Sequence, residues 1–163
     1  MTSRKRRAKI ARETVEVLDQ GCYKTDSGKV VNIKSKLEYA KENTKLYRPN
    51  DFEDIQLRTD SPGELELDVT EESTLQAARR LTEKGAFSPF VLNFASARNP
   101  GGGFLNGSQS QEESLARKTG LHPCISEKTE YYQKNRQFGS GLYTDNMIYS
   151  PRVPVIRNER GNF

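Results

Sequence analysis

The sequence has few of the residues on which metal sites and disulfide scaffolds depend. Its 163 residues include two cysteines, one histidine and no tryptophan. The cysteines, Cys22 and Cys124, are too few for a disulfide framework and are typical of a reducing compartment, so we expect a cytoplasmic protein. A zinc site would have to combine His122 and Cys124 with carboxylates, and we interpret this pair instead as ordinary loop or core residues.

Long apolar segments are also absent from the sequence. No segment approaches the roughly 20 apolar residues of a membrane span, and the N-terminus has no apolar stretch typical of a secretory signal. We therefore expect no membrane partner. Apolar residues make up 33% of the chain, which predicts a single domain over residues 1–163 with a small core.

Positive charge exceeds negative charge by only four, but it is concentrated at the N-terminus. The early basic residues are Arg4, Lys5, Arg6, Arg7, Lys9 and Arg12. A solvated helix face and a nucleic-acid-binding arm are both compatible with this cluster. We favour the solvated face, because no aromatic residues that could stack on bases lie among the basic ones.

Apolar spacing and capping residues predict a series of short elements. Residues 3–20 have helical spacing, with Ser3 as N-cap and Gly21 as the end of the helix. Further helices are predicted at 36–47, 71–84, about 110–118 and 128–132, and strands at 29–33, 64–69, 89–95, 147–149 and 153–156.

One predicted strand–helix–strand unit indicates where the loop that follows it should lie in the fold. Residues 64–69 alternate polar and apolar, residues 89–95 are mostly apolar, and a helix capped by Thr70 separates them. Such strands should be parallel neighbours with a right-handed crossover. The loop that begins near Ser96 would then lie at the carboxyl edge of the sheet, where open α/β sheets bind ligands.

Three consecutive glycines, 101–103, occupy that loop and precede a Gln-Glu-Glu triplet by seven residues. Glycines allow positive φ values and a close approach of the backbone to a ligand. Their N–H groups and the N-terminus of the next helix favour an anion. The segment therefore predicts a site for a phosphorylated or polyhydroxylated ligand.

Two adjacent carboxyl groups, those of Glu112 and Glu113, are the natural acid–base groups of this segment. A single histidine and the absence of a G-x-S-x-G motif argue against serine–histidine catalysis. Cleavage of a glycosidic bond needs a proton for the leaving oxygen, and neighbouring carboxyls raise the pKa of one member. One would carry the proton, and the other would stay ionised and hold sugar hydroxyls.

A purely structural interpretation of the same residues is also open. Ser110 and Glu113 have the spacing of a capping box, in which the serine hydroxyl caps the helix and the glutamate is its third residue. Acidic residues in a first turn also suit the helix dipole. The triple glycine could in turn be only a tight loop.

Taken together, the glycine run and the Gln-Glu-Glu triplet resemble the signature of poly(ADP-ribose) glycohydrolases. Residues 93–100 and 114–117 resemble the microbial branch of that family, as do residues 10–14 of the opening helix. The resemblance implies an α/β fold with a macrodomain-like mixed sheet flanked by helices. It also implies that ADP-ribose binds without a metal or cofactor.

The resemblance implies roles for individual residues. The second glutamate of the triplet, Glu113, would be the catalytic acid, and Glu112 would fix ribose hydroxyls. The pocket around the distal ribose would be shaped by Gly101, Gly102, Gly103 and Gln111. Asn99 is favoured over Asn93 as a sugar contact. The implied reaction hydrolyses the ribose–ribose O-glycosidic bond of poly(ADP-ribose) and releases ADP-ribose, so the polymer or ADP-ribosylated proteins would be the partners.

The sequence departs from the family pattern in one respect, because family catalytic domains continue well past the point that corresponds to residue 163. Family members continue with a second glycine-rich loop for the diphosphate, which residues 139–141 do not match. We therefore expect the N-terminal portion of the catalytic domain, with a helical extension over about residues 1–50 and an incomplete sheet that another chain could complete. The alternatives are a module that binds ADP-ribose without cleaving it and a structural or interaction protein.

Overall fold

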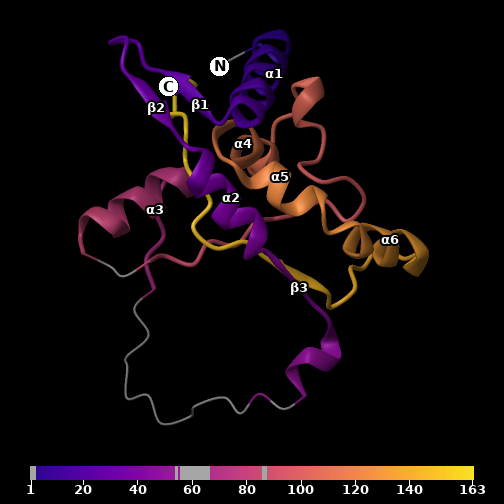
Figure 1. Ribbon diagram of the computed structural model, residues 1–163. Helices are drawn as coiled ribbons and strands as arrows, with labels where there is room; N and C mark the ends of the chain where they lie inside the picture. Colours follow the sequence, from indigo (N-terminus) through magenta and orange to yellow (C-terminus); the bar gives the residue numbers. More distant parts are fainter. Residues whose placement is uncertain (1–2, 54, 56–66, 86–87) are drawn as a thin grey trace. The chain divides into compact units, whose positions relative to one another are not determined.

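The computed structural model describes residues 3–53, 55, 67–85 and 88–163 (Figure 1). The chain divides into two units, one formed by residues 1–47 with 93–163 and the other by residues 48–92. None of the described helices is both long enough and apolar enough to cross a lipid bilayer.

Helix α1 (Arg4–Gln20) begins and ends as its capping residues predict. The Ser3 hydroxyl accepts a hydrogen bond from the N–H of Arg6, and Gly21 ends the helix with a φ of 71° and an N–H bond to the Val17 carbonyl. The predicted helix over 3–20 is therefore confirmed.

The first unit has two small apolar clusters, and α1 contributes to both. Ala11 of α1 packs with Phe104 of the 3₁₀ turn η2 (Phe104–Asn106) and with Ala116 of α4 (Gln111–Lys118). The second cluster comprises Val17, Leu18, Ile33, Leu37 and Ile156. The N-terminal helix is thus packed against the segment that carries the Gln-Glu-Glu triplet.

Two antiparallel pairs form the sheets of this unit. Strand β1 (Cys22–Lys24) pairs with β2 (Val30–Asn32), and β3 (Lys45–Tyr47) pairs with β4 (Met147–Tyr149). The strands predicted at 29–33 and 147–149 are confirmed. In the stretch predicted as a strand at 153–156, Val155 forms one isolated bridge with Thr119.

The helix predicted over 36–47 is only partly correct. Helix α2 spans Lys34–Glu42, and the last three residues of the prediction form β3 instead. Helix propensity is a weak local preference. Here the ladder with β4 gives residues 45–47 backbone partners from far along the chain.

Two further short helices complete the first unit. Helix α5 (Leu121–Ser126) follows α4 directly, and α6 (Thr129–Phe138) ends at Gly139, which has a φ of 65°. The helix predicted at 128–132 is confirmed and extends further than predicted.

The second unit contains the 3₁₀ turn η1 (Pro49–Phe52) and helix α3 (Thr74–Glu83). The predicted cap at Thr70 is wrong by three residues. Ser73 and Gln76 form a reciprocal capping box that fixes the start of the helix, whereas the Thr70 hydroxyl donates to Glu72 at 3.0 Å.

The predicted strand–helix–strand unit is not found among the described residues. Residues 64–66 lie outside them, and residues 67–70 and 89–95 belong to no strand. Both described sheets are antiparallel. A strand buried on both faces needs cover on both faces, yet the Phe94 side chain is 71% exposed. Residues 89–95 therefore have the composition of a buried strand, but Phe94 is not covered by packed elements as such a strand would require.

Candidate active site

The start of α4 and the loop before it bring the glycine run and the triplet together. Gly101 and Gly102 have φ values of 72° and 57°, which only glycine adopts without strain. They turn the chain back so that the N–H groups of this loop face the first turn of α4. The carboxyl groups of Glu112 and Glu113 in that turn accept hydrogen bonds from these N–H groups.

Glu112 is buried and fastens the loop at two points. Its side chain is 3% exposed. Oε2 accepts from the N–H of Ser96 at 2.8 Å, and Oε1 accepts from the N–H of Gly101 at 3.1 Å. Burial raises the pKa of Glu112 above its usual range, outweighing hydrogen bonds from Ser96, Gly101 and the Asn93 side chain that lower it.

Glu113 is also buried, yet its environment favours the ionised form. Oε1 accepts from the N–H of Gly103 at 3.1 Å, and Oε2 accepts from the Ser110 hydroxyl. Burial raises the pKa of Glu113, but the bonds from Ser110 and Gly103 and the charge of Arg117 together hold it below its usual value. We expected this residue to carry the proton, and its hydrogen-bond donors in the structure stabilise the charged form.

The capping interpretation of Ser110 is contradicted by the direction of its hydrogen bond. Ser110 has the extended backbone of an N-cap, but its side chain caps no N–H group of α4. Its hydroxyl donates to the Glu113 carboxylate instead. Because the carboxylate is a charged acceptor, that bond is stronger than a neutral cap.

The other predicted site residues lie along the same loop. Gln111 Oε1 accepts from the N–H of Phe94 at 2.9 Å, which holds the start of the loop to α4. Asn99 is exposed at the outer bend, where its carbonyl accepts from the N–H of Gly102 at 3.0 Å. Gly101, Gly102, Gly103, Gln111, Glu112 and Glu113 are thus brought together, with Asn99 at their edge.

The surroundings of Asn93, which we did not favour as a sugar contact, suit a ligand. Asn93 lines a cavity of about 380 Å³ with Phe94, Ala95, Tyr131 and Tyr143. Its Oδ1 is buried without a hydrogen-bond partner among the described residues, while its side chain hydrogen-bonds Glu112. A buried acceptor without a donor is costly, and in a cavity wall it suits a ligand hydroxyl. The sequence signals for Asn93 were its place in the apolar run before the glycines and the family resemblance of residues 93–100.

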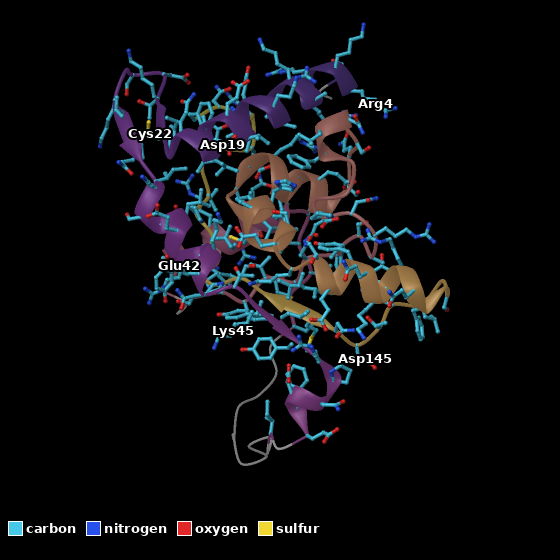
Figure 2. The ribbon with its side chains drawn as sticks, turned by 45° about the vertical axis from the view of Figure 1, so that its right-hand side comes forward. Arg4, Asp19, Cys22, Glu42, Lys45 and Asp145 are labelled. Atoms are coloured by element: carbon cyan, nitrogen blue, oxygen red, sulfur yellow. The ribbon has the colours of Figure 1, made fainter. Side chains whose placement is uncertain are left out.

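Arginine side chains hold the end of the loop. Arg4 Nε donates to the Asn106 carbonyl at 2.9 Å, Arg7 Nε to the Gly107 carbonyl at 2.8 Å, and Arg117 Nη1 to the Ser108 carbonyl at 2.6 Å. Figure 2 shows the Arg4 end of α1 beside the η2 turn, in agreement with the packing of these elements. Two of the early basic residues therefore anchor the loop rather than only facing solvent.

His122 is half-buried and Cys124 is a core residue, which agrees with the prediction of ordinary loop or core residues. The His122 ring packs on Phe104 with centroids 4.8 Å apart, and burial lowers the pKa of its imidazole. Cys124 is fully buried and its thiol donates to the Gly120 carbonyl at 3.2 Å. No group of three or more His, Cys, Asp or Glu side chains in the described part of the chain is arranged to hold a metal ion.

Comparison with known proteins identifies the family. The model of the microbial-type PARG catalytic domain, where PARG is poly(ADP-ribose) glycohydrolase, matches residues 11–158. The chain belongs to the microbial-type PARG family. A comparison with curated proteins finds no match.

Solved PARG structures resemble the chain over most of its length. The enzyme from Thermomonospora curvata superposes with a TM-score of 0.86 at 44% identity, covering 96% of this chain and 58% of that one. Its complex with the inhibitor ADP-HPD gives 0.83, with 44% identity and coverage of 96% and 57%. The Deinococcus radiodurans enzyme in complex with ADP-ribose gives 0.67 at 41% identity, covering 82% and 53%.

The likeness confirms the predicted fold class, a mixed α/β arrangement of the PARG type. The chain spans slightly more than half the length of these PARG structures.

Proposed function

We propose that the protein hydrolyses the ribose–ribose O-glycosidic bond of poly(ADP-ribose) and releases ADP-ribose, with Glu113 as the general acid. Membership of the PARG family supports this reaction, as do related structures that hold ADP-ribose or an inhibitor. The observation that carries the proposal is the contact between the glycine loop and the Glu113 carboxylate. The Gly103 N–H donates to Glu113 Oε1 at 3.1 Å in a stretch without side chains.

The reaction needs Glu113 to gain a proton, although its hydrogen bonds with Ser110 and Gly103 favour the carboxylate. The anionic diphosphate of the substrate would disfavour a second negative charge beside it and raise the pKa of the carboxyl group. Protonated Glu113 would then give its proton to the leaving ribose oxygen as the glycosidic C–O bond breaks. Water would attack the oxocarbenium-like carbon and return a proton to Glu113.

Glu112 serves mainly to position the loop in this proposal. Both its oxygens already accept N–H groups, from Ser96 and Gly101. Contacts with ribose hydroxyls, which the family resemblance implies for Glu112, would use the remaining lone pairs of the carboxylate. Gly101–Gly103, Gln111 and Asn99 would shape the pocket around the distal ribose, and Asn93 joins them as a proposed contact.

A second candidate function is recognition of ADP-ribose without cleavage. The observation that favours it is that the Ser110 hydroxyl and the Gly103 N–H both donate to the Glu113 carboxylate, because such bonds stabilise the ionised form, which has no proton to donate. An ADP-ribose end could still dock against the loop amides and the free Oδ1 of Asn93.

Calorimetry with ADP-ribose, beside an assay of ADP-ribose release from the polymer, separates these functions. Binding together with release supports the hydrolase. Binding without release supports the recognition module and refutes the hydrolase. An absence of both would overturn the assignment of the site.

Two further expectations accompany this proposal. A cytoplasmic location is supported by the absence of a disulfide, since Cys22 and Cys124 are both free thiols. Pairing with a chain that completes the sheet is supported by exposed apolar side chains near the cavity, with Phe94 at 71% and Tyr143 at 54%. If light scattering shows only monomer at high protein concentration, pairing between two copies of this chain is excluded.

A further inference from the structure

The first half of α1 has more exposed basic side chains than the two, Arg4 and Arg7, that hold the loop. Between residues 4 and 12 the helix has basic side chains and no acidic one. Arg4 and Arg7 bind loop carbonyls. The exposed remainder of the cluster consists of Lys5, Arg6, Lys9 and Arg12.

The exposed cations are not explained by the stability of the helix. Lys5, Lys9 and Arg12 recur at a spacing of four and three residues, which places them along one face. Positive charge near a helix N-terminus opposes the helix dipole. Lys9 has one ion pair, with Glu13 at 3.8 Å, and is 75% exposed. In the described ranges no ion pair involves Lys5 or Arg12.

This basic face begins directly beside the loop of the candidate active site. The loop that donates the Gly103 N–H to Glu113 ends in the carbonyls held by Arg4 and Arg7. Gly107 lies so close to α1 that a Cβ atom there would collide with the Arg4 carbonyl. The end of the loop is therefore held against the first turns of α1, the helix that carries the basic face.

We propose that the exposed basic face formed by Lys5, Lys9 and Arg12 binds the diphosphates of poly(ADP-ribose) units beyond the unit that is cleaved. This inference rests on the proposed function, because it needs a polymer end in the glycine loop. Each unit of the polymer carries a diphosphate, and a cationic groove or face binds such a chain by releasing its counterions.

The polymer fits this face better than DNA or RNA does. Single-stranded nucleic acids are usually held by aromatic side chains stacked on bases together with basic residues. No aromatic residue lies within residues 3–20. A polymer whose end is already bound in the loop would in addition reach the face at a high effective concentration. Charge alone is then sufficient.

The test compares Lys5→Ala/Arg12→Ala with Lys29→Ala/Lys36→Ala, a control that removes the same charge from exposed residues outside α1. The parent and both variants carry Glu113→Gln for these measurements, so that the polymer stays intact. Binding of long poly(ADP-ribose), of ADP-ribose monomer and of single-stranded DNA is measured by fluorescence anisotropy over a series of salt concentrations. Alanine is the strongest helix former, so α1 should persist in the first variant.

We expect the α1 variant to bind long polymer about tenfold more weakly and to bind the monomer within about twofold of the parent. The slope of log affinity against log salt should fall by roughly 1.4, which is two contacts at about 0.7 each. The control should change neither quantity by a comparable amount.

Equal polymer affinity of the α1 variant and the control would overturn the inference. Equal or tighter binding of single-stranded DNA, lost in the same variant, would also overturn it and indicate a nucleic-acid surface. A failure of the proposed function looks different: the parent with Glu113 intact would then release no ADP-ribose from the polymer, whether or not it binds the monomer, and that assay does not involve the basic face.

Discussion

A Cβ atom at Gly102 would lie 2.5 Å from Oε1 of Glu113, closer than real Cβ atoms come to any neighbour. The same Gly102 has a φ of 57°. Both facts require glycine, one for the backbone conformation and one for the space beside the carboxylate. The candidate acid and the bend of the loop therefore depend on one another.

Gly102→Ala should abolish ADP-ribose release by displacing the Glu113 carboxyl from the loop. Backbone strain alone should cost about 1–2 kcal/mol of unfolding free energy. Gly139→Ala is the matched control, since Gly139 has a φ of 65° and its nearest neighbour would be 3.8 Å away. The two variants should lose similar stability in urea titrations, whereas only Gly102→Ala should lose activity. Normal activity of Gly102→Ala would show that the contact is unimportant.

Ser110→Ala should raise the pKa of Glu113. The hydroxyl donates to the carboxylate and is the largest of the influences that lower this pKa. If Glu113 is the acid, activity falls as pH rises through its pKa, so the basic limb of the pH–rate profile should move to higher pH. Carbon-13 titration of the carboxyl group checks the same shift without an assay. Ser114→Ala, which keeps Ser110 and Glu113 intact, is the control, and an equal shift in both variants would refute the assignment.

Glu112→Gln should change how stability depends on pH. Burial raises the folded-state pKa of Glu112, so its contribution to stability is fully present below the unfolded pKa and is lost as pH rises through the folded pKa. Glutamine does not titrate. The stability advantage of the parent over the variant should therefore shrink as pH rises across that window, as measured by urea unfolding at several pH values. An advantage that grows with pH would show that Glu112 is stabilised as the anion.

Thr14→Val should destabilise the first unit by removing a buried bridge. Thr14 is fully buried, donates to the Arg117 carbonyl at 2.7 Å and accepts from Arg157 Nε at 2.9 Å. Leaving these groups unsatisfied should cost about 1–3 kcal/mol in urea unfolding. Thr82→Val in α3, where the hydroxyl is exposed, should stay within about 0.5 kcal/mol of the parent. Equal effects at the two positions would contradict the bridge.

The parts of the fold that the sequence predicted well are those with local causes. Ser3 and Gly21 mark the ends of α1, because capping and positive φ are properties of single residues in their immediate surroundings. The start of α4 after Ser110 was also predicted, although the Ser110 side chain does not cap the helix.

The errors concern partners that lie far away in the sequence. Residues 45–47 pair with β4, about a hundred residues later, and no local pattern specifies that pairing. Residues 89–95 have the composition of a buried strand, but composition does not supply the neighbouring layers. Pairing and packing partners that are distant in the sequence decide whether a segment forms a strand more than its intrinsic β propensity does.

The candidate site was predicted as a group but not in its electrostatics. The spacing of the glycines and the triplet indicated which residues meet. The pKa of Glu112 is raised mainly by burial, whereas the pKa of Glu113 is lowered by the Ser110 and Gly103 donors despite burial. The Ser110 hydroxyl could cap the helix or donate to Glu113, and only the structure distinguishes the two.

The most direct test of the central claim is the rate of ADP-ribose release from poly(ADP-ribose) by the parent and by Glu113→Gln, with ADP-ribose affinity measured on the same samples. Glutamine keeps the size of the side chain and removes the transferable proton. We expect release to fall at least about a hundredfold, the range of general acid catalysis, while calorimetry shows ADP-ribose still bound. Release by Glu113→Gln at the parent rate would contradict the account.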